Sequence, residues 1–299
     1  MLRSAASCAS WILTIVCCFN GVLRAADGDA GRKHTLRYKF AEGATLHYVV
    51  SNETSIQVQV GATSDVVQHA SESGRVLRTV AVNPDGSAAL EVMIEYVSLS
   101  AGDGAIEWDS RSGEPAPAQF TGIEKTIGTP LMTVTISADG TIVRAQRGNT
   151  LADESQLDSP EFDMLPMLPA EPIAIGESWT ERFEVGVMTE LKLKRPISMQ
   201  REYTLRSVEN GVAEIGVRTS VLTPIEDPRE QGQLIQRIQS GSFRLDIAQG
   251  QLRERVMKLD NKVVGFEGPH TALRVVGTRQ ESLGSAEKTA ARPGSKSAQ

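Results

Sequence analysis

The side chains that could support acid–base chemistry gather around one tryptophan. Asp103, Glu107 and Asp109 flank Trp108 in a glycine-containing stretch. Two carboxylates can act as the acid and base of a glycosidase, and several together can bind calcium. A calcium loop needs more oxygen ligands at fixed spacing, and a glycosidase pair is defined by a separation in space that spacing along the chain does not give. A solvated hairpin loop is the preferred interpretation, and a carboxylate-dependent hydrolase of envelope polysaccharide is kept as an alternative function.

Other catalytic and metal-binding patterns are missing from the sequence. The four histidines, His34, His47, His69 and His270, have no spacing typical of zinc ligands. There is no Gly-x-Ser-x-Gly nucleophile motif and no glycine loop that would bind phosphate. All three cysteines fall near the N-terminus, so the rest of the chain has no thiol chemistry. We therefore predict a protein that is not an enzyme, with no catalytic residue, no metal site and no cofactor.

The N-terminus has the three parts of a secretory signal peptide. A positive charge at Arg3 is followed by the apolar run Trp11–Phe19 and by the small residues Ala25 and Ala26. The run is shorter than the roughly 20 apolar residues that a membrane helix needs. We predict a signal peptide over residues 1–25, cleavage at Ala25 or Ala26, and a periplasmic or secreted protein with no membrane span in its mature chain.

The predicted signal peptide affects the net charge of the exported protein and contains two cysteines that could be lipidated. Removal of the signal peptide takes away two of 31 basic residues and none of 37 acidic ones, which leaves a net charge of −8. Such an acidic chain disfavours nucleic acid as a partner, because general phosphate binding needs a basic surface. Cys17 and Cys18 leave acylation open, although Val16 stands where a small residue normally precedes a lipidated cysteine.

From Leu36 onward apolar and polar residues alternate, as in strands with one buried face. The clearest runs are Ile56–Val60, Ala89–Tyr96, Thr133–Ile136 and Phe243–Ile247. Asp-Gly and Asn-Gly pairs between such runs favour tight hairpins. The sequence predicts a mainly β protein, with a large curved antiparallel sheet or half-barrel and at most short helices.

The β region also predicts an internal repeat. Phe40–Leu46 matches Ile173–Trp179, Val82–Val92 matches Val208–Val217, and Val134–Ile142 matches Leu245–Leu252. We therefore predict two similar halves, a first β repeat over residues 36–147 and a second over residues 171–277. Whether the halves share one sheet or form two domains stays open, as does the alternative that any two β halves with glycine turns look alike.

The remaining segments are expected to lie outside the repeats. Residues 26–35 are predicted to be a flexible N-terminus, and residues 278–299 a disordered tail with too little apolar surface to order itself. Residues 148–170 carry five acids and three prolines and are predicted to be a linker. The basic clusters Lys192–Arg195 and Arg253–Arg255 are expected to lie on a solvated outer face.

A proline-containing segment, one tryptophan and one sequon give further expectations. The proline-containing Asp109–Pro130 is expected to cross an open end or face of the sheet, where its apolar side chains can cap the core. Trp179 is expected to be a buried core anchor, and Asn52–Thr54 is a formal glycosylation sequon.

The run Leu168-Pro-Ala-Glu-Pro172, followed by Gly176-Glu-Ser-Trp179, resembles a group of exported bacterial β-rich proteins of unknown function. The resemblance implies the fold and export rather than chemistry. More loosely, such chains look like the periplasmic lipoprotein carriers, whose half-barrel holds acyl chains on a concave face; fold alone does not convey that function. The hypothesis is a non-enzymatic envelope or periplasmic module that binds an apolar ligand or an envelope protein on a concave sheet face, at residues that the sequence leaves unknown. A structural or protein-interaction domain is the first alternative.

Overall fold

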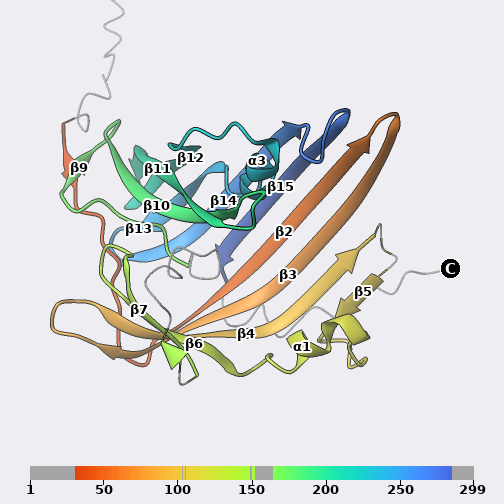
Figure 1. Cartoon of the computed structure of the whole chain (residues 1–299). Coiled ribbons are helices and arrows are strands. Elements are labelled where there is room, and N and C mark those ends of the chain that lie inside the picture. Colours follow the sequence, from red (N-terminus) through yellow and green to blue (C-terminus); the bar gives the residue numbers. More distant parts are fainter. Residues whose placement is uncertain (1–30, 103, 105, 149, 152–163, 285–299) are drawn as a thin grey trace, which may run out of the picture.

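One antiparallel sheet of 13 strands dominates the computed structural model (Figure 1). The structure describes residues 31–284, apart from 103, 105, 149 and 152–163. The predicted signal peptide with Ala25 and Ala26, and the two candidate lipidation sites Cys17 and Cys18, lie outside the described residues. Within the described part of the chain, no helix is long and apolar enough to cross a membrane.

Neighbouring strands of the large sheet follow the order β10-β11-β12-β13-β14-β15-β2-β3-β4-β6-β7-β8, with β5 paired to β4. The N-terminal half supplies β2 (Thr45–Val60), β3 (Thr63–Val82), β4 (Ala88–Ala101), β5 (Ile106–Asp109), β6 (Pro130–Ile136), β7 (Ile142–Arg147) and β8 (Thr150–Leu151). The C-terminal half supplies β10 (Ser178–Met188), β11 (Lys194–Glu209), β12 (Val212–Val221), β13 (Ser240–Asp246), β14 (Gln251–Val264) and β15 (Thr271–Leu283). The helices are short: η1 (Ala118–Phe120), α1 (Thr121–Glu124) and α3 (Pro228–Leu234).

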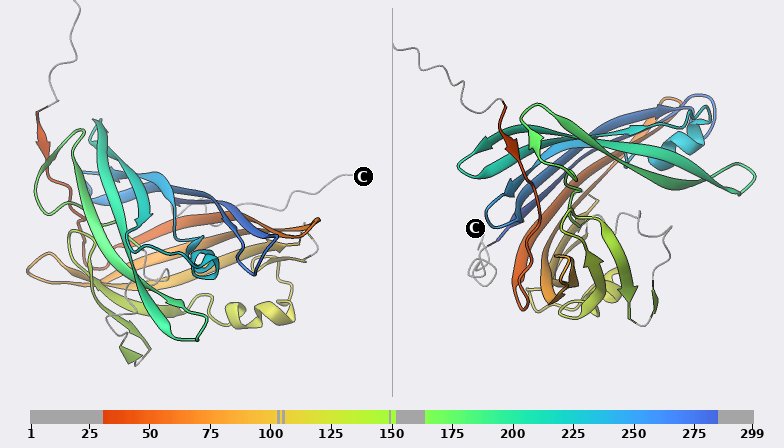
Figure 2. Two further views of the ribbon diagram at one scale, coloured as in Figure 1. Left: turned by 45° about the horizontal axis from the view of Figure 1, so that its top comes forward. Right: turned by 90° about the vertical axis from the view of Figure 1, so that its left-hand side faces the viewer.

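The two halves share one sheet, because β15 pairs with β2 from Thr271 opposite Val60 to Leu283 opposite Tyr48. The sheet is strongly curved, so that β10–β12 arch over the face of the strands that follow β2 (Figure 2). In the described chain the edge strands β10 and β8 do not pair with each other, and the barrel stays open. A mainly β fold with a large curved antiparallel sheet and short helices is thus confirmed.

Two predicted boundaries were wrong. β15 runs to Leu283, so residues 278–283 belong to the sheet rather than to a disordered tail that begins at residue 278. Residues of the predicted flexible N-terminus form β1 (Lys33–His34), which pairs with β9 (Ile173–Ala174) in a separate two-stranded sheet. In both places the order comes from pairing with strands far away in the sequence, which local composition does not reveal.

The core lies on the inner face of the curved sheet, the face that carries Tyr48 and Val50 of β2. Two irregular segments fill it. Leu36 and Tyr38 precede β2, and Met164 and Leu168 precede β9; all four side chains are buried in one cluster. Residues 164–168 are therefore part of the core, whereas the sequence predicted a linker over residues 148–170.

Residues matched by the predicted repeat make the same turn in each half. The amide of Gly43 donates to the carbonyl of Thr79 (2.9 Å), and the amide of Gly176 donates to the carbonyl of Leu205 (2.7 Å). Both glycines have a positive φ, 77° and 89°, which favours glycine at the position before each long strand. These hydrogen bonds agree with a duplication, which itself stays a prediction.

Candidate functional site

The inner face carries a trough between the packed core and α3. Pro166 of the core segment borders it on one side, and the residues that follow α3, Gln236 to Gln239, border it on the other. β2, β11, β12, β14 and β15 form its floor and walls. A smaller apolar cluster of Ile235, Val263 and Val275 lies beyond the trough. Between this cluster and the core, polar side chains take several of the lining positions, and a hollow remains.

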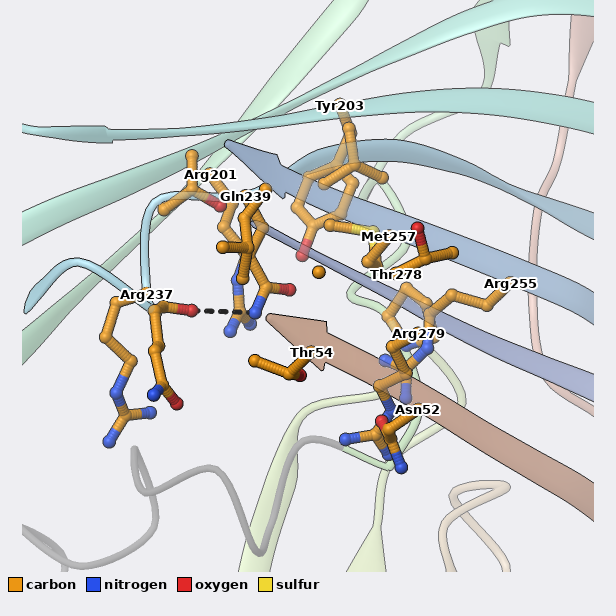
Figure 3. A pocket seen from close by; sticks show the side chains of 16 residues that line it. Asn52, Thr54, Arg201, Tyr203, Arg237, Gln239, Arg255, Met257, Thr278 and Arg279 are labelled. Atoms are coloured by element: carbon orange, nitrogen blue, oxygen red, sulfur yellow. Dashed lines mark hydrogen bonds between the residues drawn. The ribbon is translucent and has the colours of Figure 1, made fainter. Parts of the chain in front are cut away.

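The first cavity of the trough has a volume of about 270 Å³. Arg255, Arg279 and Asn52 stand together on one side of it, and Arg201, Arg237 and Gln239 stand on the other (Figure 3). The hydroxyl of Tyr203 points into the space between them (Figure 3). Its apolar lining comes from Val217, Met257 and Leu259.

A second cavity of about 690 Å³ continues from the first, since Asn52 and Arg279 line both. Its cationic side chains are Arg75, Arg147 and Arg279. Its apolar wall consists of Val50, Val92, Ile94, Leu131, Met132 and Met164. We call the two joined cavities the arginine trough.

The floor of the arginine trough is held by a buried ion-pair cluster. Glu281 of β15 has a fully buried side chain, and its Oε2 accepts a hydrogen bond of 2.8 Å from Nη2 of Arg255. Arg75 pairs with the other carboxylate oxygen of Glu281. Arg255 itself is 5% exposed. The buried carboxylate holds the two guanidinium groups in place. Loss of the carboxylate would leave two buried cations without a counter-charge, and this is strongly destabilising.

Tyr48 adds a polar contact beside this cluster. The guanidinium of Arg75 lies 5.5 Å from the centroid of the Tyr48 ring, and the Tyr48 hydroxyl donates to the carbonyl of Leu252 at 3.0 Å. Burial raises the pKa of Tyr48 to about 12, although Arg75 and Arg255 oppose this shift. Tyr48 is therefore a neutral hydrogen-bond donor at physiological pH and not an acid–base group.

The arginine trough is strongly cationic although the whole protein is acidic. Six arginines line it, and none of the described residues that line it is acidic. Within the described residues, Glu281 pairs with Arg75 and Arg255, and Glu181 lies 3.4 Å from Arg201. None of the six guanidinium groups lacks a partner in the chain. Each carries five donors, so a group already in an ion pair can still serve another acceptor.

The structure does not bring the predicted carboxylates together into a site. Asp103 lies outside the described residues. Glu107 is exposed and lines a surface hollow formed with residues 53–55 of β2, 68–70 of β3 and 276–278 of β15. This hollow shares Thr54, Gly277 and Thr278 with the first cavity of the trough. Hydrogen bonds from Arg111 hold the pKa of Asp109 below its usual value, so this carboxylate is ionised and engaged. Trp108 is buried and stacks on Phe120 instead of facing solvent as a sugar platform.

The histidines do not gather either. Among the described residues, no group of three or more histidine, cysteine, aspartate or glutamate side chains is placed to hold a metal ion. Trp179 is partly buried; its indole stacks on Tyr203 (5.4 Å between centroids) and donates to the carbonyl of Met167 at 3.0 Å. It thus packs against the core, as expected, and ties down the core segment that borders the trough.

The residues of the arginine trough were missed at the sequence level. Arg255 was assigned to a solvated outer face with Arg253, but its side chain is buried against Glu281. Arg279 and Glu281 were assigned to a disordered tail. Asn52, noted as a sequon, points into the trough and donates to Ser71. The spacing along the strand could have indicated them. Arg279 and Glu281 are separated from the apolar Val275 by an even number of positions, so in a strand all three side chains face the same side of the sheet.

Comparison with known proteins adds little about function. Residues 149–250 match a model described as "Family of unknown function (DUF6263)". The match covers less than half of the chain and includes Leu168 and Gly176–Trp179, so it agrees with the resemblance to a family of unknown function. No curated protein matches the chain.

Two solved structures match the chain at low sequence identity. A chain described as "lipid-protein interactions in lipovitellin" is 10% identical over 83% of this chain, with a TM-score of 0.45. This chain spans only 26% of that one. DynF, from the dynemicin biosynthesis pathway of Micromonospora chersina, is 6% identical over 86% of this chain and 92% of its own, with a TM-score of 0.23. At these scores the likenesses carry no argument about function.

Proposed function

We propose that the protein is an exported, non-enzymatic binding module of the periplasm or cell envelope that holds a ligand on the inner face of its curved sheet. The observation that carries the proposal is the arginine trough. It is a pair of joined cavities of about 270 and 690 Å³ on the face where the core should otherwise continue. Small-molecule sites are typically concave cavities of about 300–1,000 Å³ with apolar walls and a few convergent polar groups.

The walls of the trough are well placed for binding. Core packing holds Val50 and Met164 on one side, while the ion pairs of Glu281 hold Arg75 and Arg255 on the floor. A site whose walls are already ordered loses little conformational entropy when a ligand enters. Export is supported by the signal-like N-terminus of the sequence.

The proposal is tested with N-phenyl-1-naphthylamine, a neutral apolar probe whose fluorescence rises in apolar surroundings. The mature chain should bind it saturably, and Thr54→Phe, which adds bulk inside the first cavity, should weaken binding about tenfold. Gln280→Phe is the matched control, because Gln280 is exposed on the neighbouring strand. Absence of saturable binding, or an equal effect of both substitutions, would contradict the proposal. Native mass spectrometry of the purified chain gives an independent reading through any co-purifying ligand.

A structural or protein-interaction domain is the second candidate, favoured by one edge of the sheet. In the described chain β10 pairs only with β11, so its other side presents backbone donors and acceptors that a partner strand can use. The hairpin that follows exposes Met188, Leu191 and Leu193. If the neutral probe does not bind, this edge is the next surface to test.

A further inference from the structure

We propose that the ligand of the arginine trough is an amphiphilic anion, with a carboxylate or phosphate head among the arginines and an alkyl chain along the wall of the second cavity. This inference rests on the proposed function and specifies its ligand class. A purely apolar ligand, the first expectation from the sequence, does not suit the observed lining.

The head-group site is the place where the two cavities meet. Arg279 lines both cavities, and its direct neighbours across the sheet are Met257 on β14 and Asn52 on β2. Arg255 lies one inward position away on β14, in the same cavity. Two guanidinium groups and one amide thus converge from three adjacent strands. Guanidinium groups match the planar, two-oxygen geometry of carboxylate and phosphate better than any other side chain does.

The charge of the site favours an anion over a neutral polar head. Six arginines line the arginine trough, and none of the described residues that line it is acidic. Glu281 is completely buried and is not among the lining residues, whereas Arg75 and Arg255, which pair with it, line the trough. Each guanidinium carries five donors, so it can serve a further acceptor beside its partner in the chain.

The chain site is the apolar wall of the second cavity. Val50 on β2, Val92 and Ile94 on β4 and Met132 on β6 line this cavity together with Arg279, and Ser73 and Arg75 of β3 lie between the β2 and β4 residues. Alkyl groups placed on such a surface gain roughly 0.8 kcal/mol for each methylene fully removed from water. The cavity volume of about 690 Å³ leaves room for a chain of this kind.

The test compares three ten-carbon probes that differ only in the head, decanoate, decyl phosphate and decyltrimethylammonium, together with inorganic phosphate alone. Calorimetric titration of the mature chain should show decanoate and decyl phosphate binding at least about tenfold more tightly than decyltrimethylammonium. Inorganic phosphate should bind at least about tenfold more weakly than decyl phosphate, because it lacks the chain. Equal affinity for the anionic and cationic heads, or for phosphate with and without the chain, would overturn the proposal.

Arg279→Gln removes one cation of the head-group site and leaves the ion pairs of Glu281 intact. It should weaken decanoate binding about tenfold. Arg274→Gln is the matched control, since Arg274 lies on the same strand but forms an exposed pair with Asp260 outside the trough. An equal effect of the two substitutions would count against the site. Retained binding of the neutral naphthylamine probe, without preference for anionic heads, would reject this ligand class and leave the proposed function standing.

The chain also carries its own run of carboxylates, at Asp153, Glu154, Asp158, Glu161 and Asp163. A second protein in which these five acids are changed to amides tests whether they influence binding of the probes. Decanoate binding that depends on Arg279, in either protein, supports the proposal. Failure of both proteins to bind decanoate overturns it.

Discussion

Arg255 and Glu281 stand directly opposite each other on β14 and β15, with Nη2 of the arginine 2.8 Å from Oε2 of the glutamate. Both side chains are buried, 5% and 0% exposed. Arg75 reaches the same carboxylate from β3. This cluster takes the place of apolar packing in the middle of the inner face. It fixes Arg75 and Arg255 at the cost of desolvating three charges.

Glu281→Gln is expected to destabilise the protein strongly. The substitution keeps the shape of the side chain but leaves Arg75 and Arg255 as buried cations without a counter-charge, which typically costs about 3–5 kcal/mol. Asp260→Asn is the control, because it breaks an exposed pair with Arg274 that is worth at most about 1 kcal/mol. Urea denaturation of the three proteins gives both free energies of unfolding. Similar losses in the two variants would show that the buried cluster contributes no more than a surface pair.

Tyr48 makes stability depend on pH in the alkaline range. Burial raises its pKa from 10.0 to about 12, so between these values the unfolded chain loses a proton that the folded chain keeps. Stability from this residue is complete below pH 10 and falls by about 1.4 kcal/mol per pH unit as the pH rises toward 12. Tyr48→Phe should cost about 1 kcal/mol at pH 8, through loss of the hydrogen bond to Leu252, but should show a shallower alkaline decline. A constant difference between the two proteins from pH 9 to pH 12 would contradict this account.

Gly241 allows the close approach of β13 and β14. A Cβ added there would lie 1.9 Å from the carbonyl oxygen of Val256 on the neighbouring strand. Gly241→Ala should therefore force the two strands apart and cost at least about 1–3 kcal/mol. Gly122→Ala, at a helical glycine with nothing within 4 Å, is the control and should be neutral or slightly stabilising. Thermal melts of both variants by circular dichroism provide the comparison.

The strands were predictable wherever their inward residues are apolar. In β4, the buried residues Ala88, Leu90 and Val92 alternate with the less buried Ala89 and Glu91, and the sequence indicates this strand clearly. The end of β15 has the same parity, but its inward residues are Arg279 and Glu281. Their burial depends on Arg255 and Arg75, which other strands supply. Periodicity of hydrophobic residues cannot detect a strand whose buried face is charged.

The candidate site was missed for the same reason. A search for chemistry favoured Asp103, Glu107 and Asp109, which are close in sequence, whereas the arginine trough collects residues from strands far apart in the chain. The core segment around Met164 escaped as well. It packs as irregular chain, held by contacts such as the hydrogen bond from the Tyr38 hydroxyl to the carbonyl of Pro166 at 2.8 Å. Such segments have no period that sequence analysis can detect.

The two halves of the chain are expected to unfold together, because β15 and β2 join them along thirteen opposed residue pairs. Each half of the sheet contains one tryptophan, Trp108 on β5 in the first and Trp179 on β10 in the second. Trp179→Phe leaves a reporter for the first half, and Trp108→Phe leaves one for the second. In each variant the fluorescence transition in urea should coincide with the far-ultraviolet circular dichroism transition, as a single cooperative unit requires. Two separate midpoints within one variant would mean that one half stays folded without the shared strand pair. The arginine trough, whose walls come from both halves, would then come apart before the chain is fully unfolded.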